Sequence, residues 1–113
     1  MANARRGEIS AVIDGRDHTL CLTLGALAEL ETAFGATDLA GLGERFESGR
    51  LSARDLIRIV GAGLRGAGEP VTDDDVAAMR AEGGAIGFAG IAARLLAVTF
   101  GGEIDRASEA RPT

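Results

Sequence analysis

Two side chains of this sequence could serve as a nucleophile or a metal ligand, and each is the only one of its kind. His18 and Cys21 are the single histidine and the single cysteine among 113 residues. A zinc site needs several His, Cys or carboxylate ligands, and a catalytic thiol needs a nearby cation or a helix N-terminus. On a strand, residues three apart point to opposite faces, so His18 and Cys21 cannot cooperate. We therefore predict structural roles for both, with no metal ion and no cofactor.

The other candidate motifs lack the spacing that their chemistry requires. Residues 73–75 are three consecutive aspartates, whereas a calcium loop alternates its acids and adds a glycine and a distant glutamate. We interpret them as the first turn of a helix, where negative charge is favoured. The densest glycine cluster comprises Gly83, Gly84, Gly87 and Gly90. It follows no strand and lacks the order of a nucleotide-binding loop, so close helix packing or a hinge explains it better, and we predict no enzyme.

Three arginines lie on one side of a predicted helix that follows Ser52. They are Arg54, Arg58 and Arg65. Such a row is most often a solvated face, and the alternative is an interface with phosphate or an acidic partner. Seventeen acids against twelve arginines give a net charge of −5, which argues against binding to nucleic acid or to an anionic membrane. A small regulatory or nucleic-acid-binding module, with this helix as its recognition element, is the competing hypothesis from another class.

The hydrophobic pattern changes from strand-like to helix-like near the N-terminus. Apolar residues alternate over 9–13 and again over 20–24, with Asp14 and Gly15 suited to a tight turn between them. We predict that these two segments pair as a hairpin, with Leu22 facing the core. A helix capped by Thr23 then follows and ends at residue 35.

Further helices are predicted from caps and apolar periods over 38–48, 52–66, 72–83 and 88–99. Gly41 and Gly43 weaken the first of these. Ser52 and Asp55 have the spacing of a capping box, and the last helix is apolar enough to lie at the centre of the core. The fold class is therefore α+β, an N-terminal β-hairpin packed on a bundle of four to five short α-helices. We expect a single globular domain over 1–101 and a disordered C-terminal tail over 102–113.

The sequence also bears on location. We find no run of about 18 apolar residues that would span a membrane, and no apolar segment behind the N-terminal charges that would form a signal peptide. One cysteine allows no internal disulfide, which suits a reducing compartment. The expected location is the cytoplasm.

Four blocks of the sequence resemble a family of phage-derived tail proteins encoded in the tail gene clusters of gene transfer agents and related prophages. The blocks are residues 22–31, 52–68, 79–84 and 95–101. No single block is a chemical motif, so the resemblance depends on all four occurring in this order. It implies a role in building a siphophage-like tail, with no functional residues carried over. It also implies a bacterial cytoplasm as the location, with association to the tail during assembly.

Two tail roles fit this resemblance. One is a tail assembly chaperone that binds the tape-measure protein, and the other is a structural component, since the family is also labelled tail tube. Tube rings are built from extended β-sheets, whereas only about 15 residues here are strand-like, so the sequence favours the chaperone. The tube protein and self-association are further candidate partners. The candidate partner-binding residues lie on or beside the second helix and are Leu39, Leu42, Phe46, Arg45 and Arg50.

Overall fold

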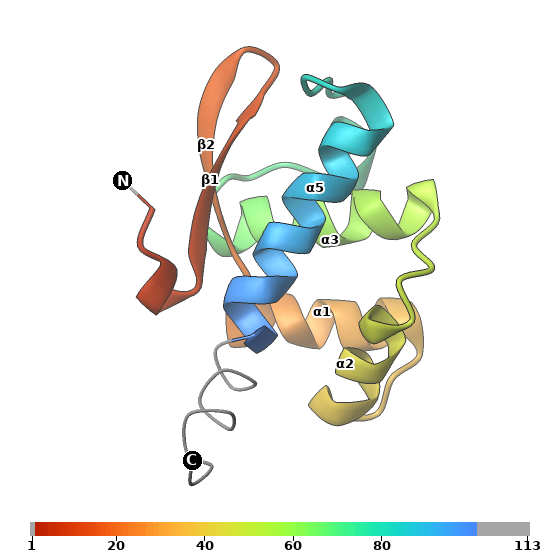
Figure 1. Ribbon diagram of the computed structural model, residues 1–113. Helices are drawn as coiled ribbons and strands as arrows, with labels where there is room; N and C mark the ends of the chain where they lie inside the picture. The colour runs from red at the N-terminus through yellow and green to blue at the C-terminus, as the bar shows by residue number, and fades with distance from the viewer. Residues whose placement is uncertain (1, 102–113) are drawn as a thin grey trace, which may run out of the picture.

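A two-stranded antiparallel hairpin leads into five α-helices in the computed structural model, which describes residues 2–101 (Figure 1). The elements are β1 (Glu8–Ile13), β2 (Arg16–Cys21), α1 (Leu24–Phe34), α2 (Leu39–Glu47), α3 (Ala53–Gly66), α4 (Asp73–Ala77) and α5 (Gly84–Leu96). A 3-10 turn (Ala4–Arg6) precedes β1, and a π-helical turn (Ala97–Gly101) extends α5. The α+β prediction is confirmed. The tail predicted over 102–113 lies outside the described residues.

The hairpin turn is at the predicted position, but its second strand is not. Asp14 and Gly15 both have positive φ, 54° and 75°, as a two-residue turn of the favoured hairpin type requires. Such a turn places Ile13 opposite residue 16, so β2 begins immediately after it and ends at Cys21. The predicted pairing of 9–13 with 20–24 was therefore wrong. Leu24 instead begins α1, where its side chain is 78% exposed.

Local capping explains where most helices begin. The Thr23 side chain accepts a hydrogen bond from the Ala26 N–H at the start of α1. Ser52 and Asp55 form a complete capping box at the start of α3, as their spacing predicts. A second capping box of the same kind opens α4. Each cap satisfies backbone N–H groups that the first turn of a helix leaves free.

Helix α4 is shorter than predicted, because the chain after it pairs with the hairpin tip. The Asp14 N–H donates to the Arg80 carbonyl at 2.7 Å, and the Arg80 N–H donates to Asp14 Oδ1 at 2.8 Å. Ile13 also forms a β-bridge with Ala81. These bonds hold the backbone extended, so α4 ends at Ala77 rather than at 83, and α5 begins at Gly84 rather than at 88.

The central helix of the core is α3, not α5. The run from Ile59 to Leu64 is buried throughout and packs against the hairpin, α1 and α5. Figure 1 shows α3 passing behind α5, with the hairpin on one side and α1 below. Helix α5 buries Ile91, Ala92 and Leu95 but leaves Ile86 84% exposed, so the expectation that it lies at the centre was wrong.

The segment Gly84–Gly101 is an 18-residue helical stretch with a mean hydropathy of 1.6. By length and composition it could cross a membrane, which corrects the expectation that no such stretch exists. Core helices of other proteins pass the same test but are mostly buried, whereas only 17% of this stretch is buried. Here the segment packs on α3 and β1, and Arg94 within it donates to the Ser10 carbonyl at 3.1 Å.

Candidate partner-binding surface

His18 forms a buried contact between the hairpin and the α3–α4 connection. Its side chain is 4% exposed, with Nδ1 at 2.5 Å from Glu69 Oε1 and Nε2 at 3.1 Å from the Ile13 carbonyl oxygen. Because a carbonyl oxygen can only accept, Nε2 carries the hydrogen of that bond. The geometry supports the structural role predicted for His18. Glu69 lies 51 residues away in the sequence, and no local signal could have identified it as the partner.

Cys21 is half-buried on the other face of the hairpin. Its thiol donates to the Arg6 carbonyl at 3.7 Å. Burial raises the pKa of the Cys21 thiol, and the Glu8 carboxylate raises it further, whereas Arg6 lowers it by less. A thiol with a raised pKa is a poor nucleophile at neutral pH, which supports an inert packing role. Among residues 2–101, no group of three or more His, Cys, Asp or Glu side chains is placed to hold a metal ion.

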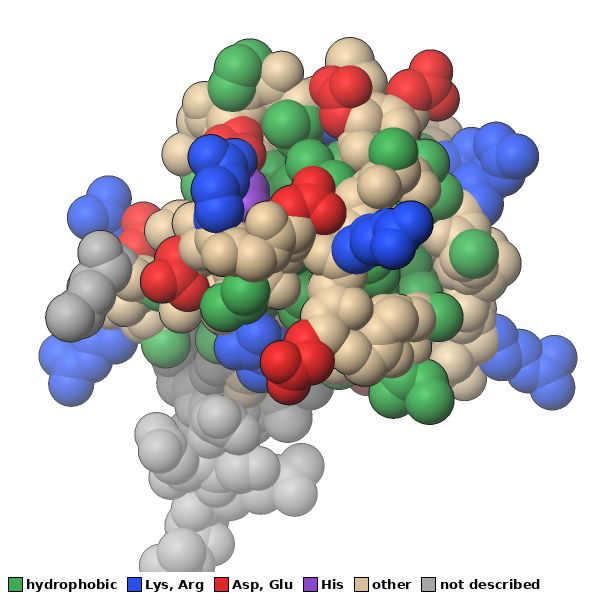
Figure 2. Space-filling view, turned by 90° about the horizontal axis from the view of Figure 1, so that it is seen from above, with side chains coloured by type: hydrophobic (Ala, Val, Ile, Leu, Met, Phe, Trp, Pro, Cys, Tyr) green, Lys and Arg blue, Asp and Glu red, His purple; other side chains and the backbone are tan. Residues whose placement is uncertain are grey.

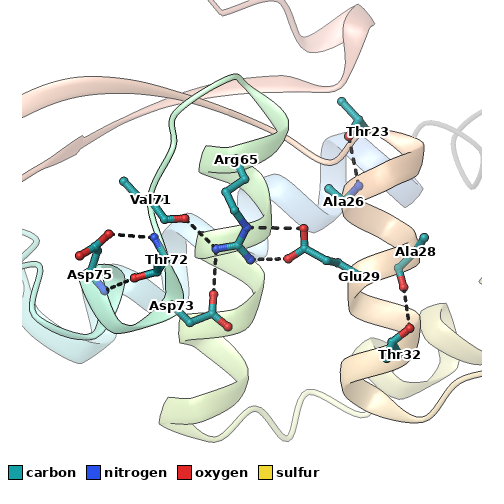
Figure 3. Close-up of polar contacts among 10 residues, drawn as sticks. All are labelled: Thr23, Ala26, Ala28, Glu29, Thr32, Arg65, Val71, Thr72, Asp73 and Asp75. Carbon is teal, nitrogen blue, oxygen red and sulfur yellow. Dashed lines mark hydrogen bonds and ion pairs between the residues drawn. The ribbon is translucent and has the colours of Figure 1, made fainter.

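The predicted row of solvated arginines is largely engaged in contacts within the chain. The Arg65 guanidinium donates to both carboxylate oxygens of Glu29 on α1 and, at 3.0 Å, to Asp73 Oδ1 on α4 (Figure 3). Hydrogen bonds to Glu29 are the main cause of the raised pKa of Arg65; burial opposes them, and the bond to Asp73 adds to them. Arg58 donates to the Ala33 carbonyl at 3.2 Å.

The solvated-face interpretation was therefore wrong for two of the three arginines, Arg58 and Arg65, which tie α3 to its neighbours. Asp73 pairs with Arg65 and is also the first residue of α4, where the field of the helix N-terminus favours a negative charge. The exposed Arg54 has neither an ion pair nor a side-chain hydrogen bond in the part of the chain that the structure describes.

The apolar stripe of α2 is used within the chain. Leu42 is fully buried, and Phe46 packs edge-to-face on Phe34 with ring centroids 5.3 Å apart. Arg45 donates to Asp55 Oδ2 and to the Arg50 carbonyl, both at 3.1 Å, and its guanidinium lies 5.4 Å from the centre of the Phe34 ring. Of the five candidate partner-binding residues, Leu39 and Arg50 are exposed.

An open apolar groove lies elsewhere, between α3, α4 and α5. It has a volume of about 160 Å³. All the residues that line it have apolar side chains: Ala53, Leu56, Ile57, Val76, Ala77, Met79, Ala85 and Phe88. We call it the α3–α5 groove. Sequence reasoning identified the apolar positions of α3 and α4 but not that they meet in an open depression, because this depends on where α4 ends.

Hydrophobic side chains are also prominent on the face that carries the hairpin tip and the start of α5. Figure 2 shows them spread over this face among acidic, basic and other side chains, with no continuous basic patch.

The family comparison agrees with the resemblance seen in the sequence. A family model described as "Phage tail tube protein, GTA-gp10" matches residues 6–102. The chain belongs to this family. No curated protein and no solved structure matches it. The GTA-gp10 family consists of phage tail proteins rather than enzymes, and the matched range contains the hairpin, all five helices and the α3–α5 groove.

Proposed function

We propose that this GTA-gp10 family member is a tail assembly chaperone that binds the tape-measure protein during tail morphogenesis. The observation that carries the proposal is the α3–α5 groove, an apolar depression framed by three helices. A tape-measure protein exposes long apolar helices before tube subunits surround it. Helical proteins with an apolar groove bind such segments by covering one face of the helix.

The scarcity of strand supports the same proposal. Each strand of the hairpin has six residues, and the described sheet consists of these two strands alone. Tube rings that join sheets between subunits need longer strands with accessible edges. The second candidate, a structural tail component, is favoured by the family's own description as a tail tube protein.

The proposal is tested with the tape-measure protein from the same tail gene cluster. Co-expression should convert that protein from insoluble to soluble, and the two should co-purify. Deletion of the gene should abolish tails and leave DNA-filled heads. Quantitative mass spectrometry of purified particles distinguishes the two candidates. A chaperone is absent or nearly so, whereas many stoichiometric copies would overturn the chaperone proposal and favour the structural one.

A further inference from the structure

We propose that the α3–α5 groove is the docking site for one amphipathic helix of the tape-measure protein. This inference rests on the proposed chaperone function and adds where on the chain the partner binds. It also specifies the charge pattern that the bound helix must carry.

The lining of the groove suits a helix. Its edges include Ala53, Ala77 and Ala85, all exposed, and small side chains at the edges let the backbone of a bound helix approach closely. The half-buried side chains of Met79 and Phe88 also line the groove. Methionine is flexible and polarizable, so it can adjust to different apolar side chains along a long partner. A groove of this type takes anchor residues spaced one helical turn apart.

The charged side chains of α3 and α4 divide into two groups. Those with an ion pair or a side-chain hydrogen bond within the chain are Asp55, Arg58, Arg65, Asp73 and Asp75. Arg54 and Asp74 are both exposed and have no such partner among residues 2–101. All the other charges on these two helices are therefore satisfied internally.

The two free charges lie on two of the helices that frame the groove. Arg54 lies one helical turn before Ile57 on α3, and Asp74 lies one turn before Ala77 on α4. Residues three apart on a helix share a face. The α3 side of the groove thus carries a free positive charge and the α4 side a free negative charge, and the ligand complementary to these two sides is a helix whose apolar stripe has an acid on one side and a base on the other. Rim charges of this kind orient a partner and speed its association.

The surface of α2 is a weaker site by the same criteria. Its most apolar residues, Leu42 and Phe46, are already buried, and Arg45 is held by Asp55. A partner would find Leu39 exposed there, but α2 contributes no residue to the lining of the α3–α5 groove.

The test is co-purification of the full-length chain with the co-expressed tape-measure protein. Ala77→Arg places a long charged side chain in the groove from an exposed position, and we expect it to lower the amount of partner recovered by about ten-fold or more. Ala40→Arg makes the same change on an exposed position of α2 and should leave recovery unchanged. Thermal melting shows that each variant is folded. Ala85→Arg, on the α5 side of the groove, replaces Ala77→Arg if the latter lowers the melting temperature.

Reversal of the rim charges gives an independent readout. Arg54→Glu and Asp74→Arg should each slow association and reduce its dependence on salt. If the wild-type chain binds and Ala40→Arg, rather than Ala77→Arg, lowers recovery, the groove inference is overturned while the chaperone function stands. If the groove variants change only the oligomeric state of the chain, the groove is an interface between copies and the inference also fails. If the wild-type chain recovers no tape-measure protein, the proposed function itself fails.

Discussion

Replacing Gly66 by alanine should destabilise the protein, whereas the same replacement at Gly43 should stabilise it. Both glycines are in helices, and alanine is favoured over glycine in a helix by about 1 kcal/mol. The two sites differ in the space that a methyl group would find. A Cβ at Gly43 meets no atom within 4 Å, whereas a Cβ at Gly66 would lie 1.9 Å from the Cys21 carbonyl oxygen.

The magnitude follows from that distance. Ordinary contacts of a Cβ begin at 3.4 Å, so the Cys21 carbonyl would have to retreat by about 1.5 Å, a backbone shift of the kind that costs about 1–3 kcal/mol or more. Gly66 is the last residue of α3, where the gain in helix propensity is small. We expect Gly66→Ala to lower the free energy of unfolding by about 2 kcal/mol. Gly43→Ala should raise it by about 0.5–1 kcal/mol.

Thermal unfolding followed by far-UV circular dichroism measures both variants. For a domain of this size, 1 kcal/mol corresponds to a shift of about 4–8 °C. Gly66→Ala should therefore lower the midpoint by about 10 °C, and Gly43→Ala should raise it by about 4 °C. A Gly66→Ala midpoint at or above that of the wild type would refute the close approach of α3 to the end of β2. A lower midpoint for Gly43→Ala would mean that α2 packs against another part of the protein at Gly43.

Three further predictions concern single interactions. Ser52→Ala removes the side-chain half of the α3 capping box and should cost about 1 kcal/mol in a urea titration; an unchanged midpoint would place the helix start elsewhere. Leu22→Ala leaves a cavity beneath the hairpin and should cost about 2–4 kcal/mol, so a loss below about 1 kcal/mol would mean that this segment is not docked. Burial alone would raise the pKa of Asp55, but hydrogen bonds from Ser52 and Arg45 outweigh it and the net pKa is lowered. The stability that Asp55 contributes is therefore present above the ordinary carboxyl pKa and is lost as the pH falls through the lowered value. Asp55→Asn should reduce the loss of folding stability at acid pH. An unchanged loss of stability at acid pH would contradict the assignment.

The features predicted correctly from the sequence depend on hydrogen bonds between near neighbours. The Asp14-Gly15 turn and the cap at Thr23 each involve residues at most three positions apart. Such signals are contained in a short window, so residue types are enough to find them. The end of α4 depends instead on the hydrogen bond between Arg80 and Asp14, which lies 66 residues earlier. The periodic apolar pattern continues past Ala77, so it does not indicate that the helix ends there.

The candidate site was harder to predict for a related reason. A stripe such as Leu39, Leu42 and Phe46 has the same spacing whether it is covered by the chain itself or by a partner. Similarly, an arginine row looks the same in the sequence whether it is solvated or, like Arg65, pairs with Glu29 across 36 residues. Periodicity identifies which side of a helix is apolar or charged. It does not identify what lies against that side, and this is what distinguishes core from surface.

The edge of the hairpin provides a further argument between the two tail roles. A ring of joined sheets uses a head-to-tail contact, so each subunit must offer both edges of its sheet. Here the outer edge of β1 is already engaged, because Arg94 of α5 bonds to the Ser10 carbonyl and the Arg80–Ala81 segment pairs with the end of the strand. A tube subunit built from this fold would have to break these contacts before a neighbouring strand could pair with β1. A chaperone that binds through the α3–α5 groove requires no such rearrangement, and the hairpin then serves to hold the α4–α5 connection in place beside the groove.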